Sequence, residues 1–422
     1  MTRRTRWQRV RLILLATILV ALVGYVGCDV WSGRRIAIEL ANLESRYGSL
    51  SSQSASPEVP AAENRARLVK AAAALVNTVN QKDQTELSRF MRDPAARTVP
   101  PALTAYIDTN AQAIALARQF VARPRSSFAV DYRGSNNRPD LLEIRMLANV
   151  LFLATVQAIE NGKLDEAAAL VVANESLSSA GRNEPDLITQ LIRIAVADIT
   201  ANGLQRLLES GTPSKASLTQ LAQALAENRE PAPITIGLMG EVKTAHWAFS
   251  QLEAGRKHNL AETGLSSAVS VPWPRLVRPY FRTAHARYLA EAGRLLDIQT
   301  GPRPRPAGEE RRYPPAWALI DRLALMFTNG LMRSIETGDD FARTQAAAEI
   351  AVALRRHKID WGTYPDDLPV LVPTYLSQLP IDPSTGKPPI YKPDAEGFTL
   401  TTSPSINYAA TKRPTAVWKI TR

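Results

Sequence analysis

Seventeen consecutive residues without a charged side chain, Leu12 to Cys28, constrain this chain more than any other part of its sequence. As a helix rising about 1.5 Å per residue, the stretch covers about 26 Å, slightly less than the roughly 30 Å of a bilayer's hydrocarbon core. Flanking arginines can extend to the headgroups and cover the difference. Trp7 and Trp31 bracket the stretch, and tryptophan is enriched at membrane interfaces. The sequence therefore predicts a transmembrane anchor over 12–28.

The distribution of arginine predicts how this anchor is oriented. Arg34 and Arg35 follow the apolar stretch, whereas five arginines precede it. The five are Arg3, Arg4, Arg6, Arg9 and Arg11. Positively charged residues near a membrane span tend to stay on the cytoplasmic side. Residues 1–11 are therefore expected to form a cytoplasmic basic tail, with the rest of the chain outside the cytoplasmic (inner) membrane.

Cys28 leaves two alternatives to a retained anchor. It is the only cysteine of the chain and follows Gly27 at the end of the apolar stretch, where a lipoprotein signal places its acylated cysteine. Tyr25 stands where such signals usually have leucine. A cleaved secretory signal needs small residues spaced for cleavage, which are missing after Val26. The retained anchor is therefore the leading hypothesis, and lipidation of Cys28 is a minor one.

Net charge and cysteine content exclude other classes of protein. The chain carries a formal charge of +11, but residues 1–35 hold seven arginines and one aspartate, so the other 387 residues carry only +5. Basic residues elsewhere are scattered and not interleaved with aromatic ones, so no nucleic-acid partner is expected. A single cysteine rules out an internal disulfide framework and a cysteine-based zinc site.

The region after the anchor predicts a mostly α-helical fold. Residues 29–62 are expected to form a juxtamembrane helix and then a tether rich in Ser, Pro and Ala, and residues 63–300 a domain of irregular stacked helical hairpins. The segment 158–170 loosely resembles the turn of a tetratricopeptide unit. Prolines at helix starts and glycines at helix ends place the boundaries. The expected helices are 62–80, 100–122, 139–160, 164–180, 185–209, 214–228, 232–254 and 276–299.

The last third of the chain changes in composition. Residues 301–315 are expected to form a Pro-rich strap, and 316–422 further helices plus a small α+β segment. The expected helices are 315–335 and 339–359, with Asp339 or Asp340 capping the second. The expected strands are 389–392, 398–402 and 416–421.

The segment from Ala351 to Ser403 resembles the C-terminal half of the type II secretion major pseudopilin. It contains Gly-x-Tyr-Pro at 362–365, Tyr-Leu-x-x-Leu-Pro at 375–380 and Asp-Pro at 382–383. The resemblance implies a helix followed by a small antiparallel sheet. A prepilin signal needs a small residue before the apolar stretch and a glutamate inside its start, and both are missing. The pseudopilin calcium site is not expected either, because no acidic residue follows Thr402.

The order of anchor, tether, helical hairpins, Pro-rich strap and pseudopilin-like end also resembles a family of membrane-anchored bacterial envelope proteins with no assigned activity. This resemblance covers nearly the whole chain. It implies architecture and an envelope location, and it implies no chemistry.

No catalytic residue, metal ligand or cofactor is predicted. The sequence lacks HExxH, a phosphate-binding glycine loop and GxSxG, and its four histidines share no helical spacing of three or four residues. One weak candidate for a polar groove is the pair Asp198 and Asn202, which a helix over 185–209 places on its apolar face with Ile199. The alternative is a structural bond to a neighbouring helix, or an exposed helix end.

Three function classes follow from these patterns. The first is a non-catalytic interaction or scaffold protein of the bacterial envelope, with an envelope protein as its partner. The second is a structural component of a secretion or pilus-like machine. The third is an extracytoplasmic hydrolase, which would require a convergent cleft of histidine and acidic side chains.

Overall fold

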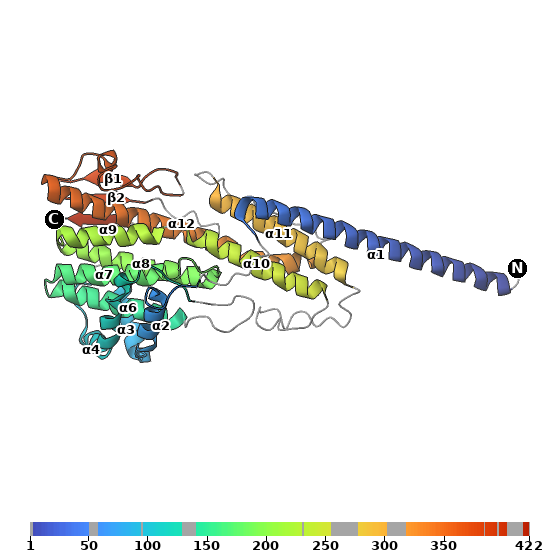
Figure 1. The fold of residues 1–422 in the computed structure, drawn as a ribbon, viewed down its shortest axis with the longest axis horizontal. Coiled ribbons are helices and arrows are strands. Elements are labelled where there is room, and N and C mark those ends of the chain that lie inside the picture. Colours follow the sequence, from blue (N-terminus) through green and yellow to red (C-terminus); the bar gives the residue numbers. More distant parts are fainter. Residues whose placement is uncertain are drawn as a thin grey trace. The chain divides into compact units, whose positions relative to one another are not determined.

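The chain is mostly helical, and a three-stranded antiparallel sheet lies near its C-terminus (Figure 1). The structure is a computed structural model that describes residues 3–49, 58–93, 96–128, 141–229, 232–254, 277–301, 318–383, 385–394, 396–402 and 417–421. The expected fold class is confirmed. Most of the expected Pro-rich strap, the central part of the expected tether and residues 255–276 lie outside the described residues.

The chain divides into two units. Unit 1 comprises residues 1–53, 241–297 and 310–332, and unit 2 comprises 54–240, 298–309 and 333–422. In unit 1 the helix that contains the anchor is grouped with residues 241–297, a distant part of the chain.

Unit 1 is built around α1 (Arg3–Tyr47), one helix that contains the apolar stretch and the expected juxtamembrane helix. The C-terminal part of α10 (Pro233–Glu253) and most of α11 (Arg278–Thr300) lie alongside the C-terminal part of α1 (Figure 1). Covered side chains recur along α1 every three or four residues, as one helix face requires. They include Asp29, Ser32, Ile36 and Leu43. Among the described side chains of α1, the first buried one is Ser32, four residues after the apolar stretch ends.

Unit 2 contains the remaining helices and the sheet. Its core lies around α6, α7 and α8, whose short connections make them antiparallel neighbours. The helical elements before α10 are α2 (Arg65–Ala74), α3 (Gln81–Arg92), α4 (Pro101–Thr109), α5 (Ala111–Ala117), the 3₁₀ turn η1 (Phe120–Ala122), α6 (Leu141–Glu160), α7 (Leu164–Ser179), α8 (Leu187–Ser210) and α9 (Lys215–Arg229).

Helix boundaries in unit 2 follow local chemistry. The Asn64 side chain accepts the Ala66 N–H at the start of α2, and the Asp186 carboxylate accepts the Thr189 N–H at the start of α8. Gly162 has a φ of +71° between α6 and α7, a conformation that side-chain-bearing residues rarely adopt. These residues position the helices whose side chains form the polar network described below.

The sheet has the order β1-β2-β3, with β1 Ile390–Pro393, β2 Gly397–Thr401 and β3 Val417–Thr421. All three strands lie within one or two residues of their expected positions. Tyr391 pairs with Leu400, which pairs with Trp418. Leu400, Phe398 and Ile420 are buried in the same core as the helices, so the sheet is an integral part of unit 2.

Two helices expected from the sequence differ in the structure: one is shorter and the other is divided. The helix expected over 62–80 ends at Ala74, and α3 begins at Gln81 in a segment where no helix was expected. The helix expected over 100–122 is divided at Asn110, whose side chain accepts the Asn77 N–H and so ties the break to the end of α2. Polar side chains that bind backbone groups offer an alternative to helical hydrogen bonds, which explains this break.

The two helices expected over 315–335 and 339–359 are one helix, α12 (Ala318–Trp361). The expected capping role of Asp339 or Asp340 is therefore wrong, and Asp340 instead pairs with Arg343 one turn later. Gly338 does not break the helix: a Cβ atom there would lie 2.5 Å from Cγ1 of Ile234. A close approach between helices explains this glycine.

Candidate functional site

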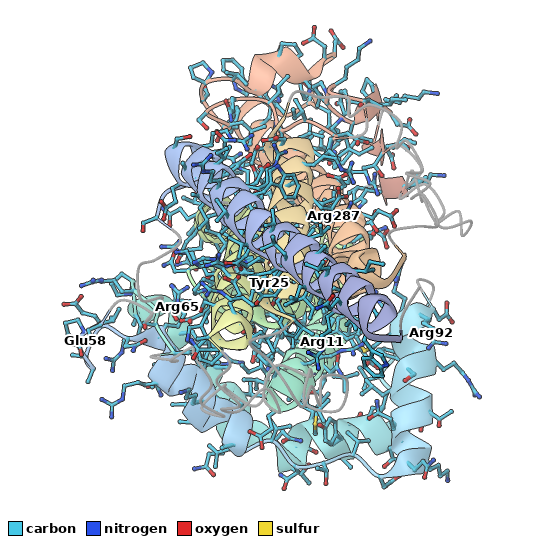
Figure 2. The ribbon with its side chains drawn as sticks, turned by 90° about the vertical axis from the view of Figure 1, so that its right-hand side faces the viewer. Arg11, Tyr25, Glu58, Arg65, Arg92 and Arg287 are labelled. Carbon is cyan, nitrogen blue, oxygen red and sulfur yellow. The ribbon has the colours of Figure 1, made fainter. Side chains whose placement is uncertain are left out.

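The apolar N-terminal helix is the first functional feature of the structure. None of the most apolar stretch of α1 is buried. Among the residues that the structure describes, α6 and α8 are also long and apolar enough to cross a membrane, but 61% of the most apolar stretch of each is buried inside the fold. The apolar surface of α1 is therefore uncovered, whereas α6 and α8 bury most of theirs against other parts of the protein. Figure 2 labels Arg11 and Tyr25 along this helix.

Cys28 lies inside α1 and is a free, exposed cysteine. The helix runs through it without interruption, and the neighbouring Ser32 hydroxyl donates to its carbonyl oxygen at 2.7 Å. The Cys28 thiol therefore lies on the uncovered side of the anchor, directly before Asp29.

The two residues of the predicted polar groove lie in different surroundings. Asp198 is exposed on α8, so its expected position against the core is wrong. Asn202 is half-buried; its side-chain N–H donates to the Met91 carbonyl at 3.1 Å, and its Oδ1 accepts from Arg206 Nε at 2.9 Å. Asn202 therefore makes the structural bond to a neighbouring helix, α3, that was the alternative to a ligand groove.

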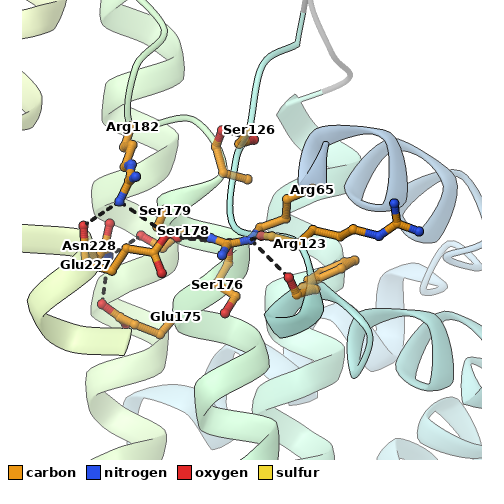
Figure 3. A network of polar contacts seen from close by, with 12 residues as sticks. Arg65, Arg123, Ser126, Glu175, Ser176, Ser178, Ser179, Arg182, Glu227 and Asn228 are labelled. Carbon is orange, nitrogen blue, oxygen red and sulfur yellow. Dashed lines mark hydrogen bonds and ion pairs between the residues drawn. The ribbon is translucent and has the colours of Figure 1, made fainter. Parts of the chain in front are cut away.

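Unit 2 contains a buried polar network that the sequence did not predict (Figure 3). Its outer part is Arg65, whose Nη1 donates to Ser179 Oγ at 2.6 Å and to the Glu227 carboxylate at 3.1 Å. Nε of Arg65 also donates to the carbonyls of Phe120 and Arg123. One guanidinium thus connects α2, η1, α7 and α9.

The inner part of this network surrounds Asn228 at the end of α9. Its side-chain N–H groups donate to Glu175 Oε1 and Ser178 Oγ, both at 2.7 Å, and its Oδ1 accepts from Arg193 Nε at 2.9 Å. Gln345 of α12 donates to the same Glu175 oxygen at 3.1 Å. We call this set, Arg193, Asn228, Glu175, Ser178 and Gln345, the Asn228 network.

Glu175 is the most perturbed carboxyl group of this network. Burial raises its pKa to about 7, against the opposing effects of the bonds from Asn228 and Gln345 and of the nearby Arg193. A carboxyl group of this kind can exchange a proton near neutral pH. Its side chain is enclosed by helices, with 2% of the residue exposed, so the network stabilises and specifies helix packing rather than presenting groups to a ligand.

Unit 1 contains a series of hydrogen-bonded ionisable side chains that links α1, α10 and α11. Nδ1 of His246 on α10 lies 3.0 Å from Nε2 of His285 on α11, and Nδ1 of His285 lies 2.8 Å from Glu253 Oε1 on α10. Phe249 stacks on the His285 ring with 4.8 Å between ring centroids. His285 is buried, His246 is half-buried, and Glu253 is mostly covered.

Arg282 extends this series of hydrogen bonds to α1. Arg282 Nε donates to Glu253 Oε2 at 3.2 Å, and its Nη1 donates to the carboxylate of Asp29 at 3.0 Å and to the Asp29 carbonyl at 3.1 Å. Arg278 forms a longer ion pair with the other Asp29 oxygen at 3.6 Å. We call His246, His285, Glu253, Arg282 and Asp29 the relay, because adjacent members share hydrogen bonds.

The surroundings of the relay shift two pKa values downward. Burial lowers the pKa of His246, and the adjacent His285 imidazole lowers it further. For Glu253, burial opposes ionisation, but hydrogen bonds and charge from His285 and Arg282 outweigh it and lower the pKa. Above neutral pH the relay therefore holds a carboxylate at Glu253 and a neutral imidazole at His246.

A series of hydrogen-bonded side chains of this kind can accept or pass a proton. Glu253 orients His285 as a carboxylate orients a catalytic histidine, but among the described residues no hydroxyl or thiol nucleophile is hydrogen-bonded to His246. No group of three or more metal-ligating side chains exists within the described ranges either. Proton uptake is thus the chemistry that these residues support.

Sequence reasoning missed the relay because it compared histidines only along single helices. His246 and Glu253 are seven residues apart, so they lie on one face of α10, and Arg282 and His285 are three apart on α11. The relay could have been found only by placing these faces of α10 and α11 against each other, and a single sequence does not show which helices pack together.

A surface hollow of about 590 Å³ lies beside α3. Its lining residues are Gln84, Thr85, Ser88, Arg89, Arg92 and Asp93. All of these belong to α3 or its end, so among the described residues no second element converges on the hollow, as a binding site would require.

No protein-family model matches this chain, and neither a curated protein nor a solved structure shows significant similarity to it. The candidate sites therefore rest on their own geometry.

Proposed function

We propose that this protein is a single-pass, membrane-anchored scaffold or interaction protein of the bacterial envelope, with its N-terminus in the cytoplasm. The observation that carries the proposal is the uncovered apolar surface of α1, with exposed fractions of 66% for Leu12 and 60% for Leu19. In water such a continuous apolar surface is costly, whereas in a bilayer it is matched to its surroundings.

The orientation rests on the five arginines before the apolar stretch and the two after it. The scaffold role rests on the character of unit 2. Its helical hairpins enclose Glu175 and Arg193 in a closed network, and helix stacks of this kind offer extended outer faces to other proteins.

The second candidate is a structural component of a secretion or pilus-like machine. It is favoured by the end of unit 2, where α12 is followed by a 3₁₀ turn (Leu368–Leu371) and the antiparallel sheet, the order that the pseudopilin resemblance implies. It is weakened by the sequence around 1–12, which lacks the prepilin signal.

Membrane anchoring is tested by extraction of membranes with alkaline carbonate. The full chain should remain in the membrane pellet, and a variant with Leu15→Arg and Leu19→Arg should be released, because arginine at the centre of a span is strongly unfavourable. Release of the unchanged chain would contradict the proposal.

Orientation is tested with reporter fusions after residue 60. A reporter active only outside the cytoplasm should be active on the unchanged chain. The triple substitution Arg3→Ser, Arg4→Ser and Arg6→Ser leaves two arginines on each side of the stretch, so we expect mixed orientation. Activity of a cytoplasmic reporter on the unchanged chain would reverse the assignment.

The partner is tested by crosslinking in intact cells followed by capture of the anchored protein. A stoichiometric envelope protein other than secretion components supports the scaffold role. Capture of secretion components would favour the second candidate. Absence of any stoichiometric partner would contradict both.

A further inference from the structure

We propose that the relay is an acid-responsive latch, which holds α10 and α11 against the membrane-proximal part of α1 until the His246–His285 pair binds a second proton. This inference goes beyond the proposed function, and it rests on geometry within unit 1 alone.

The hydrogen positions follow from the contacts. Because Nδ1 of His285 lies 2.8 Å from the Glu253 carboxylate, it carries the proton of that hydrogen bond. Nε2 of a neutral His285 is then an acceptor, and Nδ1–H of His246 donates to it across 3.0 Å. The hydrogen bond between the two rings thus needs no positive charge.

The pair can take one extra proton without losing this bond. A proton that binds Nε2 of His246 allows the Nδ1 proton to pass to Nε2 of His285, after which His246 is neutral again and accepts the same hydrogen bond. The positive charge then lies on the ring beside Glu253, which compensates it.

A second extra proton has no such arrangement. Both nitrogens that face each other would then carry hydrogen, so no acceptor remains between them, and two cationic rings would lie with centroids 5.0 Å apart. Like charges at this distance repel, and burial strengthens the repulsion. The rings must separate, which moves α10 away from α11.

The charged groups around the pair do not remove this conflict. Glu253 of α10 is shared between His285 and Arg282, so it already faces one permanent cation. From α1, Glu44 acts on His246 and Asp29 is paired with Arg278 and Arg282 of α11. Glu241 of α10 lies near the buried hydroxyl of Tyr288. The two carboxylates that act on the pair are Glu44 and Glu253, and Arg282 already balances part of the Glu253 charge. They can therefore balance the positive charge of one added proton better than that of two.

The relay couples the imidazole pair to α1 through Arg282. This guanidinium is hydrogen-bonded to both Glu253 and Asp29. It also lies close to the backbone of α1, because a Cβ atom added to Gly33 would be only 3.1 Å from Arg282 Nη1. The guanidinium therefore has little room to move independently of α1. Displacement of Glu253 therefore disturbs the contact with Asp29, directly after the apolar stretch. The other end of α1 keeps its separate bond from Tyr47 to Asp297 at 2.7 Å, so opening begins at the membrane-proximal end.

The sign of the pH effect follows from linkage. His246 has a lower pKa in the folded unit than when unfolded, so its contribution to stability is complete above the unfolded value of about 6.5 and is lost as the pH falls below it. Glu253 also has a lowered pKa, so its contribution is lost only at more acidic pH. Both groups make acid loosen unit 1.

The test is a spin-label distance measurement on the full-length protein in lipid nanodiscs. Labels on Ile38→Cys of α1 and Ala290→Cys of α11, both exposed positions, in a Cys28→Ser background report the closed packing. Between pH 8 and pH 5 the short distance should give way to longer ones. Where the closed pair already holds its first extra proton, the open-to-closed ratio should rise by up to about tenfold per pH unit, the limit for uptake of one further proton.

Two variants make the result specific. His246→Gln keeps a side-chain N–H that can donate to His285 but cannot become charged, so its distances should not change with pH. His357→Gln removes a histidine of unit 2 that bonds the Thr363 carbonyl, and it should respond as the unchanged protein does. Circular dichroism at pH 8 verifies that both variants are folded.

Three outcomes would overturn the latch. The first is a distance that does not change with pH in the unchanged protein, and the second is a pH response that persists in His246→Gln. The third is a zinc-dependent narrowing of the distances at pH 7.5 that a chelator reverses and His246→Gln abolishes, because the pair would then be part of a metal site.

Discussion

Gly240 of α10 packs directly against the main chain of Pro185: a Cβ atom at position 240 would lie 1.7 Å from the Pro185 carbonyl oxygen and 2.4 Å from its carbon. Both residues belong to unit 2. The obstacle is backbone rather than a flexible side chain, so a substitution at 240 must displace the whole helix. This contact places the start of α10 against the turn that leads into α8.

Gly240→Ala should therefore destabilise unit 2 although alanine favours helices. Overpacking of this kind costs about 1–3 kcal/mol, more than the gain of about 1 kcal/mol from helix propensity. Gly203→Ala is the matched control, because its Cβ would make an ordinary contact at 3.5 Å with Phe152. Thermal unfolding followed by circular dichroism should show a lowered midpoint only for Gly240→Ala. Equal midpoints for the two variants would contradict the close contact.

Arg206 holds the end of α3, and its loss should release that helix. It is buried, donates to the carbonyls of Phe90, Asp93 and Ala96, and lies 5.1 Å from the Phe90 ring centroid. Arg206→Gln leaves carbonyls without donors, at a cost of about 3 kcal/mol. The control Arg97→Gln removes an exposed ion pair worth at most about 1 kcal/mol.

Hydrogen exchange over residues 81–92 measures this effect. The amides of α3 should exchange faster in Arg206→Gln and remain unchanged in Arg97→Gln. Unchanged protection in both variants would show that α3 is held by its apolar contacts alone.

This arginine also explains why α3 was not predicted. Only Leu87 and Phe90 of α3 are buried, and apart from them and the half-buried Met91 the helix is polar, so its apolar stripe is short. Its stability depends on Arg206 and Asn202, more than 100 residues later in the chain. Such long-range bonds leave no local signal.

Elements with local signals were predicted well. α6 to α9 lie within about two residues of the expected ranges, because glycine and proline mark their ends and their cores are strongly apolar. The failures at Gly338 and Asp339 have one cause. Glycine and aspartate signal a helix boundary locally, but here glycine serves close packing with Ile234 inside a continuous helix.

The candidate sites were less accessible to sequence reasoning than the fold. Each is assembled from helices far apart in the chain: the Asn228 network joins Glu175 with Gln345, and the relay joins Asp29 with Arg282. Charged residues on helices are usually solvated, so each of these side chains seemed ordinary in isolation. Only the pairing of helices reveals that they are buried and connected.

Glu175 should give unit 2 a pH dependence opposite to that of unit 1. Its pKa is raised from 4.5 to about 7, so the folded state binds more protons than the unfolded state between these values. Its contribution to stability is therefore present below about pH 4.5 and is lost as the pH rises through about 7. Glu175→Gln keeps an oxygen for Asn228 and Gln345 without a charge, so it should stabilise unit 2 above pH 7 by up to about 3 kcal/mol.

Urea unfolding at pH 5 and pH 8 measures this difference. The stability gain from Glu175→Gln should be larger at pH 8 than at pH 5. Glu166→Gln is the control, because Glu166 is an exposed partner of Arg118 and should give little change at either pH. A gain that is the same at both pH values would mean that Glu175 is ionised throughout.

Truncation should separate the apolar part of α1 from the part that packs. Deletion of residues 1–24 removes most of the apolar stretch but retains Asp29, Ile36 and Leu43, so the shortened protein should be soluble with unit 1 folded. Deletion of residues 1–60 also removes the covered face of α1 and leaves Phe281 and Leu289 of unit 1 without one of their neighbouring helices. Hydrogen exchange over 241–254 and 278–297 should be slow in the first protein and fast in the second, while α6 and α7 remain protected in both. Equal protection of 241–254 and 278–297 in the two proteins would show that these helices fold without α1, and the relay would then not connect them to the anchor helix.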